Sequence, residues 1–568
     1  MKNYHLYSIN HKRFDMNKLY LFTVTLFLSI AGYAQNTSCN WAFAHSGTNT
    51  FNGKIYYTAI DHQGNIIQGG TIAGIADMDP GSGPGDTAYT YPTYNYYISK
   101  TDISGNLLWL KFFTYSSSIQ AFSINGLEIN SQNEIIVLGE YFGGIDVDLS
   151  LSGVDTLHSH QPTYPDFFLA KYDANGDLQW AHTYGGTGGS LAAGSLAVMS
   201  NDNLIVTFNP TTGMDIDPDA GITIPTGNNA QIVCYNNAGQ FLWNNHISNP
   251  TSYCIDNKSV SCDAAGNSYL CSVGYYKLTV TKFDNLGNLL WEKTIGDFPT
   301  GARVDPHSLL VYPDGRFFVV GNFQGNVDFD PGTGTLNFAA SSALNEDGFF
   351  AAYDSSMTPI WIKQYSGGSI TFGNQSLTSI GTDLITGGSV SGAVLMGPGI
   401  TFSSSSSSNF LLSVDASGNI TGGGTFVCDG ITNTINSDAA GRLITAGIFR
   451  GTPDMDPMSG AVYTISSGTY ITSFVAVYAP TSTELPGTPA TTALAVYPNP
   501  AAQMIRFAHS FETMSDIEIY SSGGMLIYKT QLAPHENTLN LEHFSGGMYT
   551  LRLINEKTTF YSRFMVVD

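Results

Sequence analysis

The chain repeats one short pattern: a turn that opens with Asp or Asn, followed by a strand that carries Trp. In residues 284–291 (DNLGNLLW) the Trp comes seven positions after the turn opener, and the same spacing recurs from Asp102, Asp173, Asn236 and Asp354. The six Trp of the chain all occupy this position in the strand: Trp41, Trp109, Trp180, Trp243, Trp291 and Trp361. A recurring hairpin of this kind predicts a repeated all-β architecture.

A second turn precedes each Trp hairpin. It opens at Asp61, Asp263, Asp314 and Asp438, with looser forms at residues 131–134, 201–203 and 381–383. Asp accepts N–H groups within such a turn, and Gly adopts the left-handed conformation that closes it. Each repeat therefore has four short strands, which in the third repeat we expect at residues 196–199, 204–208, 231–235 and 241–245.

The two ends of the repeat array are complementary. The last repeat stops after a third strand at residues 473–478, and residues 41–47 supply a lone fourth strand with Trp41 but no turn. Four strands per unit at this period are typical of a β-propeller. The sequence thus predicts a seven-bladed β-propeller over residues 35–479, closed by pairing the N-terminal strand with the last blade, which removes exposed edges.

The N-terminus has the pattern of a secretory signal. Lys18 precedes an apolar run at residues 19–30, and Ala34 is a small residue at the expected cleavage position. We predict a signal peptide over residues 1–34, with Met16 as a possible true start. The run is too short to span a bilayer, so no transmembrane segment is predicted in the mature chain.

Export places the six cysteines in an oxidising compartment, where disulfides are allowed. Their spacing is not that of a metal site, because no Cys-x-x-Cys occurs. Cys262 and Cys271 flank one predicted hairpin, but the expected register puts Ser259 opposite Cys271. The sequence assigns no disulfide.

Charge limits the class of partner. The 568-residue chain has a formal net charge of −23, and such a chain is repelled by phosphate backbones and anionic lipid heads. Nucleic acid is therefore excluded as a predicted partner, whereas cations, proteins and neutral glycans remain.

The C-terminal part has a different composition. Residues 480–492 are rich in Pro, Thr and Ser and are expected to form a linker. Beyond them, alternating strands at residues 517–520, 526–530 and 548–554 predict a small β-sandwich over residues 493–568.

Four motifs in this part occur in a fixed order: residues 496–500 (VYPNP), 517–524 (IEIYSSGG), 544–549 (FSGGMY) and 563–567 (RFMVV). With them, residues 493–568 resemble the type A C-terminal sorting domain of the type IX secretion system of Bacteroidetes, although the chain ends in Asp568 where the family usually ends in a basic residue. The resemblance implies Sec export, recognition by the type IX machinery and removal of the tail, giving a secreted or cell-surface protein. The propeller repeats resemble the SBBP class of bacterial β-propeller repeats.

The clearest candidate for a ligand site is Asp-x-Asp, usually followed by Pro, between the second and third strands of a repeat. In an extended chain residues i and i+2 face the same side, so each motif pairs two carboxylates, and the expected loops share one rim. Ca²⁺ binding is one interpretation, and capping of backbone N–H groups at a turn is the other. The candidate metal ligands are Asp77, Asp79, Asp146, Asp148, Asp215, Asp217, Asp328, Asp330, Asp454 and Asp456.

No catalytic residue and no cofactor other than Ca²⁺ is predicted. The Trp positions are interpreted as structural anchors between blades, with stacking on sugars as the alternative. His158 and His160 form an exposed pair in one insertion, and residues 403–408, a run of Ser, are expected to form a flexible loop. The predicted function is a non-enzymatic binding or adhesion module for a protein or glycan. The alternative is a polysaccharide-acting hydrolase or lyase with its site on the acidic loop face.

Overall fold

The computed structural model describes residues 37–566 except for a series of segments, and the chain divides into two compact units, Met1–Pro480 and Thr481–Asp568. The prediction of an all-β protein is confirmed, since the described residues contain strands and turns but no helix. Correspondingly, these residues include no helix long and apolar enough to cross a membrane. The segments outside the description are residues 46, 49–52, 73–74, 80–86, 90–94, 116–121, 151–152, 162–163, 187–191, 211–212, 219–224, 226–228, 249–252, 255–257, 275–276, 296–301, 343–345, 398–399, 427–428, 457–462, 468–470, 481–491, 494–495, 498–502, 508–514, 522–525, 534–537, 542–543, 545–546 and 556–557.

Most of the described strands of the first unit fall into seven antiparallel sets, numbered here in chain order, and the remaining ones form small sheets of two or three strands. The first three are β3(Lys54–Ile60)-β4(Ile66–Ile72)-β7(Asn95–Thr101)-β8(Leu107–Phe112), β10(Phe122–Ile129)-β11(Ile135–Tyr141)-β14(Asp166–Tyr172)-β15(Leu178–Tyr184) and β16(Ala192–Val198)-β17(Leu204–Asn209)-β18(Gln231–Tyr235)-β19(Phe241–His246). In the fourth set β20(Tyr253–Cys254) and β21(Val260–Cys262) both pair with β22(Ser268–Gly274), followed by β23(Lys277–Phe283) and β24(Leu289–Ile295).

The last three sets are joined into one 11-stranded sheet. The fifth is β25(Arg303–Val311)-β26(Phe317–Gln324)-β29(Asp347–Tyr353) with the first part of β30(Pro359–Ile380), and the rest of β30 begins the sixth, with β31(Asp383–Gly397), β32(Ile400–Val414) and β33(Ile420–Phe426). The seventh is β34(Asp429–Ser437)-β35(Leu443–Arg450)-β36(Thr472–Pro480)-β1(Thr37–Ala44), linked to β30 by the bridge between Gln375 and Thr434.

The turns form as the sequence predicts because Asp and Gly satisfy their geometry. Asp284 Oδ1 accepts the N–H groups of Leu286 and Asn288 at 2.9 and 2.8 Å, and Gly287 has a φ of 83°. The hydrogen bond from the Asn288 side chain is the main cause that lowers the pKa of Asp284. The same carboxylate pattern recurs at Asp102 and Asp415, so each hairpin is closed locally by its own sequence.

Consecutive sets contact each other through their first strands. β3 contacts β10, β10 contacts β16, β16 contacts β21, β21 contacts β25, β25 contacts β30 and β30 contacts β34. β34 of the seventh set then contacts β3 of the first. The order of neighbours therefore returns to its start, and the apolar side chains that face a seam are buried between two consecutive sets, as in the cluster shared by the first and second sets.

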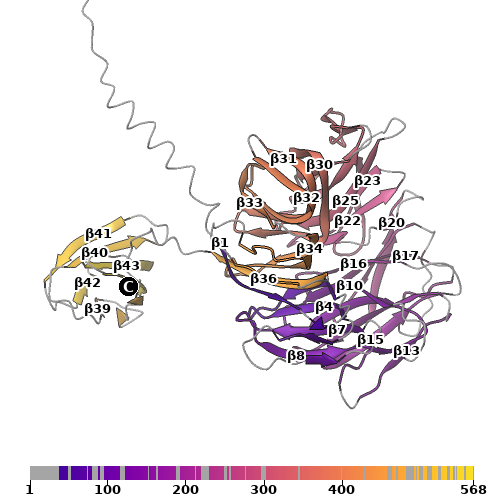
Figure 1. Ribbon diagram of the computed structural model, residues 1–568, viewed down its shortest axis with the longest axis horizontal. Coiled ribbons are helices and arrows are strands. Elements are labelled where there is room, and N and C mark those ends of the chain that lie inside the picture. The colour runs from indigo at the N-terminus through magenta and orange to yellow at the C-terminus, as the bar shows by residue number, and fades with distance from the viewer. Residues whose placement is uncertain are drawn as a thin grey trace, which may run out of the picture. The chain divides into compact units, whose positions relative to one another are not determined.

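The N-terminal strand completes the seventh set. β1 pairs antiparallel with β36, from Thr37 opposite Pro480 to Ala44 opposite Phe474, as the lone Trp41 strand predicts (Figure 1). Beyond the ladder, His45 N–H donates to Ser473 O at 3.0 Å and the Thr472 hydroxyl donates to His45 O at 2.6 Å. Two segments more than 400 residues apart in sequence are thus held in one sheet.

Strand bounds agree with the expectation in the third repeat, where the first strand is longer at its start (Ala192) than predicted. The expectation of a flexible loop at residues 403–408 is wrong, because these residues lie in β32 and pair with β31. Small hydroxyl side chains are compatible with a strand when neighbouring apolar residues set its register. The Ser-rich composition of residues 403–408 therefore does not distinguish a loop from a strand. The predicted position of Ser259 is confirmed: Cys271 N–H donates to Ser259 O at 2.7 Å.

The described thiols are unpaired. Cys39, Cys234, Cys262 and Cys271 are free, and burial raises the pKa of Cys39 and of Cys234 to about 12. Buried thiols of this kind are inert toward oxidation and metals. Cys428 lies outside the described residues.

The second unit has two sheets around one apolar cluster. The larger has the order β37(Thr492–Ala493)-β44(Thr558–Val566)-β43(Gly547–Asn555)-β40(Ser515–Ser521)-β41(Leu526–Leu532), and the smaller β38(Val496–Tyr497)-β39(Met504–Phe507)-β42(Thr538–Asn540). The cluster between them includes Ile505, Ile519, Leu539 and Leu551. The three strands expected from the sequence correspond to β40, β41 and β43.

Candidate functional site

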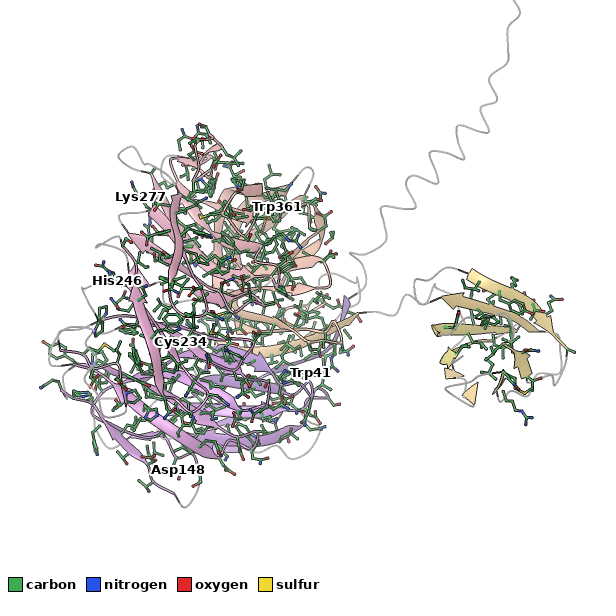
Figure 2. All side chains as sticks on the ribbon, turned by 180° about the vertical axis from the view of Figure 1, so that it is seen from behind. Trp41, Asp148, Cys234, His246, Lys277 and Trp361 are labelled. Carbon is green, nitrogen blue, oxygen red and sulfur yellow. The ribbon has the colours of Figure 1, made fainter. Side chains whose placement is uncertain are left out.

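Five of the six Trp side chains donate a hydrogen bond to a carbonyl group of the next set; Trp41 and Trp361 are labelled in Figure 2. The indole N–H of Trp41 donates to Ile103 O at 2.8 Å, and that of Trp361 donates to Ala416 O at 2.9 Å. Trp109, Trp180 and Trp243 make the same bond to Ala174 O, Asn237 O and Asn285 O. Each acceptor follows the turn opener of the next set, so the geometry favours the structural interpretation of Trp.

In several of these turns the glycine makes room for the neighbouring ring, whereas the turn of the fifth set has Met357 at this position, with a φ of 61°. A Cβ built on Gly287 would lie 2.5 Å from Trp243, and one on Gly418 would lie 2.7 Å from Trp361. This also explains why Gly422 stands where Trp is expected in the sixth set, seven residues after the turn opener Asp415. The following set has no turn between its last two strands, because β36 and β1 come from opposite ends of the unit. A Trp at residue 422 would have no such turn to dock on.

The Asp-x-Asp segments share one arrangement, in which the middle residue is buried and the first Asp binds backbone. Asp328 Oδ1 accepts the N–H groups of Asp330 at 3.0 Å and Leu336 at 2.7 Å. Asp146, Asp215 and Asp454 accept the N–H of the second Asp at 3.0–3.1 Å in the same way. The buried middle residues are Met78, Val147, Ile216, Phe329 and Met455.

In three of the sets, a tyrosine of the same set is hydrogen-bonded to this segment. The hydroxyl of Tyr353, at the end of β29, donates to Phe329 O at 3.1 Å, and Tyr172 and Tyr235 make the same bond to Val147 O and Ile216 O at 3.0 Å. Burial raises the pKa of all three phenols, and the nearby Asp carboxylates raise it further.

Sets that contain the Asp-x-Asp motif usually also contain this tyrosine, a correlation in the sequence that sequence reasoning missed. The second, third, fifth and seventh sets have both Tyr and Asp-x-Asp, whereas the fourth and sixth have Phe283 and Val414 at the Tyr position and lack the motif. The first set is the exception, with the motif and Thr101. The motif and the end of the third strand therefore form one packing unit.

The insertions that contain the motif connect neighbouring sets. β12(Gly144–Asp146) pairs with β9(Thr114–Tyr115), which follows the last strand of the first set, and with β13(Thr156–His158). β5(Ile75–Asp77) likewise pairs with β2(Gly47–Thr48), which follows β1, and with β6(Thr87–Tyr89). In the fifth set β27(Asn326–Asp328) pairs with β28(Asn337–Ala339).

The candidate carboxylates therefore lie at different interfaces between neighbouring sets, which are called seams here. Asp79 Oδ1 accepts Leu107 N–H at 3.4 Å, at the start of the last strand of its own set, and Asp215 N–H donates to Gly185 O of the preceding set at 3.3 Å. Among the described residues no group of three or more His, Cys, Asp or Glu side chains is placed to hold a metal ion. Asp148 is labelled in Figure 2.

We expect Asp328→Ala to lower the free energy of unfolding by roughly 1–2 kcal/mol, because two N–H groups lose their acceptor. Millimolar Ca²⁺ is expected to leave the melting temperature unchanged. Denaturant unfolding measures the first effect and thermal melting with and without Ca²⁺ the second, with the exposed Asp429→Ala as the matched control. A Ca²⁺-induced rise in melting temperature that Asp328→Ala removes would support the metal interpretation.

Of the two histidines in the insertion of the second set, His160 binds a carboxylate of its own set. His160 donates its backbone N–H to Asp166 Oδ2 at 2.7 Å, and its Nδ1 lies 2.6 Å from the same oxygen. Ser341 binds Asp347 in the fifth set through its N–H and its hydroxyl in the same way. His160 therefore fastens a loop to a buried carboxylate.

The first strands are bound to one another by polar side chains. The Thr58 and Thr434 hydroxyls lie 2.7 Å apart, and Asn433 Nδ2 donates to Ile55 O at 3.1 Å, which joins the seventh set to the first. Thr58 N–H also donates to Gln375 Oε1 of the sixth set at 3.5 Å. These side chains are buried, so this region is filled by protein.

His45 makes the pairing of β1 with β36 sensitive to acid. Its ring is buried, with Nδ1 3.0 Å from the Ser473 hydroxyl, and burial lowers its pKa from 6.5 to about 4. Because the unfolded chain binds the proton more tightly, this contribution to stability is complete above pH 6.5 and is lost as pH falls toward 4. The loss is on the order of 3 kcal/mol.

Urea unfolding at pH 7 and pH 5 measures this dependence. His45→Asn is expected to flatten it, whereas the exposed His62→Asn should retain it. An unchanged pH profile in His45→Asn would contradict the assignment.

Comparison with known proteins identifies the second unit. The fold defines an all-β chain with a separate C-terminal unit, and residues 495–567 match the family model described as "Secretion system C-terminal sorting domain". This match agrees with the four motifs of the type IX resemblance and indicates secretion to the cell surface or the extracellular space. A search among curated proteins finds no significant match.

Solved structures add little. A protein of unknown function from Dyadobacter fermentans is similar at 10% identity over 78% of this chain and 99% of its own, with a TM-score of 0.38. One from Bacteroides caccae is similar at 11% identity over 58% of this chain and 93% of its own, with a TM-score of 0.30. Similarities of this size carry no argument about fold or function.

Proposed function

We propose that the chain is an exported binding protein, in which residues 35–479 form a seven-bladed β-propeller and residues 493–568 are the signal for type IX secretion. The match of residues 495–567 to the sorting-domain family carries the proposal of export, since these residues lie in a compact unit of their own. The predicted signal peptide, residues 1–34, lies outside the described residues and supplies the Sec step of the proposed route.

Three features support the propeller. Most strands fall into seven sets, and contacts between first strands run from each set to the next and from β34 back to β3. The pairing of β1 with β36 makes the last set four-stranded. In a propeller, such a strand from the other terminus closes the ring and leaves only short, protected edges.

Binding of a protein or a glycan is the proposed activity, because the repeated hydrogen bonds hold a rigid frame from which loops of differing sequence project. Within that frame, the Asp and Trp residues of the repeats hold neighbouring sets together. Nothing in the described residues favours the polysaccharide-acting hydrolase or lyase over a binding protein.

The test of export uses the full chain and a chain ending at residue 480, both expressed in a host with a type IX system and in a host lacking it. The full chain is expected outside the wild-type cells with its tail removed. The shortened chain and the full chain in the deficient host should remain in the periplasm. Equal export of the shortened chain would contradict the proposal.

The test of binding applies the exported product, recovered from the medium or released from the cell surface, to arrays of neutral and acidic glycans and to whole cells. Saturable binding that heat denaturation removes is expected on at least one of them. Binding that persists after denaturation, or its absence from every surface, would remove the binding function without affecting the export result.

A further inference from the structure

A cluster of polar side chains joins the second set to the third. Its members are Lys171 near the end of β14, Asn130 and Glu134 from the turn between β10 and β11, and Asn237 from the turn between β18 and β19. Asn130 is buried, and the side chains of Lys171 and Glu134 are only 9% and 18% exposed. The indole N–H of Trp180 donates to Asn237 O at 3.2 Å and so holds the turn of the third set against the second.

The side-chain amide of Asn237 contacts each of the other members. Its Oδ1 lies 3.4 Å from Lys171 Nζ and 3.2 Å from Asn130 Nδ2, and both nitrogens donate to it. Its Nδ2 donates to Glu134 Oε2 at 3.3 Å, and the same oxygen accepts from Lys171 Nζ at 3.0 Å. Because an ammonium only donates and a carboxylate only accepts, these contacts set which end of the amide faces which neighbour.

The first set provides a comparison that lacks the amide. Lys100 occupies the place of Lys171 there, and its Nζ lies 2.9 Å from Asp61 Oδ2. The same Nζ donates at 3.1 Å to the backbone oxygen of Ala174, which is the residue that corresponds to Asn237 in the next turn. Both seams thus bring together a lysine, a carboxylate and a neighbouring turn. Of the two, only the seam between the second and third sets adds a side-chain amide.

This arrangement meets the requirements for joining an amine to an amide carbon. The amine must lie beside the carbonyl group, one group must move protons from the amine to the leaving nitrogen, and a donor must stabilise the carbonyl oxygen. Glu134 Oε2 contacts both nitrogens, Lys171 Nζ and Asn237 Nδ2. Asn130 Nδ2 donates to the carbonyl oxygen of Asn237.

Glu134 is ionised at neutral pH and can therefore accept a proton. Burial raises the pKa of Glu134, but the hydrogen bonds from Asn130, Lys171 and Asn237 outweigh burial and lower the pKa below its ordinary value.

We propose that Lys171 and Asn237 form an intramolecular isopeptide bond, with Glu134 as the proton carrier. The bond links positions 66 residues apart, in two different sets. A link of this kind restricts the unfolded chain as a disulfide does, but reductants do not break it. The described cysteines are free, so the bond supplies a covalent cross-link that they do not. It depends neither on export nor on the ligand of the proposed function.

The reaction needs no oxidant or cofactor. Lys171 gives a proton to Glu134, and the lone pair of Nζ then forms a bond to Cγ of Asn237. Negative charge develops on Oδ1, which the Asn130 amide stabilises. When the carbonyl re-forms, the Cγ–Nδ2 bond breaks with its electron pair, and Nδ2 takes the proton from Glu134 and leaves as ammonia. The remaining surplus proton of the amine converts ammonia to ammonium, so one lysine ammonium and one asparagine amide give one new amide and one ammonium ion.

Intact mass spectrometry of the chain without its predicted signal peptide, residues 35–568, tests the bond. The wild-type chain is expected to be lighter than its sequence mass by one ammonia molecule. A succinimide at Asn237 also releases ammonia, so a tryptic digest analysed by tandem mass spectrometry is the second readout. It should contain one branched peptide that joins Lys171 to Asn237, with no cleavage after Lys171.

Variants separate the reacting groups from the surrounding structure. Lys171→Arg keeps the positive charge but removes the amine, and Glu134→Gln keeps the shape but removes the proton acceptor. Both variants are expected to have their full sequence mass. The matched control Lys100→Arg makes the same change in the first set and should leave the loss of ammonia complete.

A wild-type chain of full sequence mass would overturn the proposal and leave the cluster as a set of hydrogen bonds and ion pairs. Loss of ammonia that persists in Lys171→Arg, or a branched peptide that joins other residues, would overturn it as well. Should the variants fail to fold, the wild-type digest decides alone, and cleavage after an unmodified Lys171 would contradict the bond.

Discussion

A chain that begins at residue 47 is expected to lose at least about 4 kcal/mol of the stability of its first unit. The missing segment holds β1, whose backbone pairs with β36 along seven residue pairs from Thr37 to Ala44. It also removes Trp41, which packs with Ile55 and Val477 between the seventh and first sets and binds Ile103 O. Truncation of a fully buried Trp costs about 3–5 kcal/mol; Trp41 is partly buried and contributes less, and the lost strand pairing adds to its contribution.

Denaturant unfolding of the shortened chain, followed by intrinsic fluorescence and circular dichroism, measures the loss. A synthetic peptide of residues 36–46 added in excess should restore part of it, because the exposed edge of β36 is a template for one antiparallel strand. The same peptide with Trp41→Ala is the control and should restore less. An unfolding midpoint equal to that of the intact chain would show that β1 does not close the array.

The second large effect is expected for Phe329→Ala, at about 3–5 kcal/mol. Phe329 is the middle residue of an Asp-x-Asp segment, and its ring packs against Phe323, Phe338 and Phe349 at centroid distances of 5.5, 5.7 and 5.1 Å. Its removal leaves a cavity in the seam between the fourth and fifth sets.

Two variants separate packing from the surrounding hydrogen bonds. Tyr353→Phe removes only the hydroxyl that donates to Phe329 O and should cost about 1 kcal/mol. Leu286→Ala, at a side chain that is 70% exposed, should stay within about 0.5 kcal/mol of the wild type. Comparable losses in Phe329→Ala and Leu286→Ala would contradict the role of the motif as a seam anchor.

The features that the sequence predicts correctly follow from the repeated pattern. The turn at Asp284 is closed by contacts within five residues, so its pattern can be read without knowing the rest of the fold. The strand at Trp41 could be assigned to the last repeat because a four-stranded unit lacked its last member. Both inferences depend on the repeat rather than on long-range packing.

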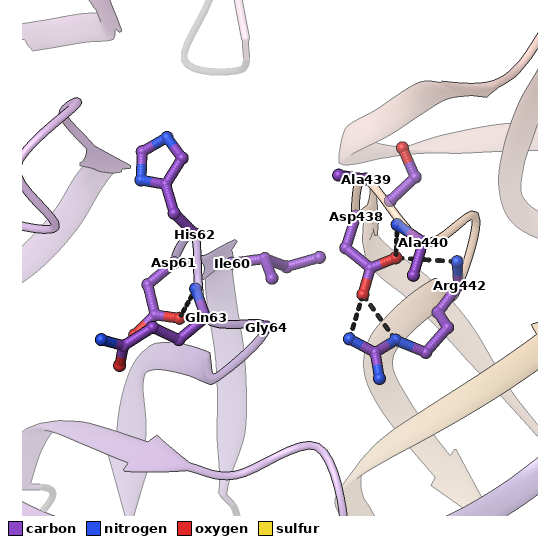
Figure 3. A pocket seen from close by; sticks show the side chains of 10 residues that line it. Ile60, Asp61, His62, Gln63, Gly64, Asp438, Ala439, Ala440 and Arg442 are labelled. Carbon is purple, nitrogen blue, oxygen red and sulfur yellow. Dashed lines mark hydrogen bonds and ion pairs between the residues drawn. The ribbon is translucent and has the colours of Figure 1, made fainter. Parts of the chain in front are cut away.

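The role of Asp-x-Asp could not be predicted from the alternation of its side chains. The alternation correctly separates the buried middle residue from the two carboxylates, but the partner of Phe329 O is Tyr353, 24 residues away. Only the coincidence of Tyr and the motif across repeats carried that information. The pocket lined by residues 60–64, 437–440 and 442 is likewise formed by two turns from opposite ends of the array (Figure 3), and the sequence of one turn does not show which turn lies beside it.

The Ser run at residues 403–408 shows a limit of composition. The run has no apolar alternation, yet the flanking residues Phe402 and Phe410 are buried and hold β32 in register with β31. A strand can therefore extend through residues that would favour a loop in isolation.

Hydrogen exchange of the full mature chain, read by mass spectrometry on peptides that cover β1 and β36, tests the closure most directly. Closure predicts that those amides of residues 37–44 that are hydrogen-bonded to β36 exchange as slowly as the amides of β35 and β36, because all three strands open only when the first unit unfolds. Complete exchange of residues 37–44 within seconds at neutral pH, with β35 and β36 still protected, would contradict the closed seven-set array.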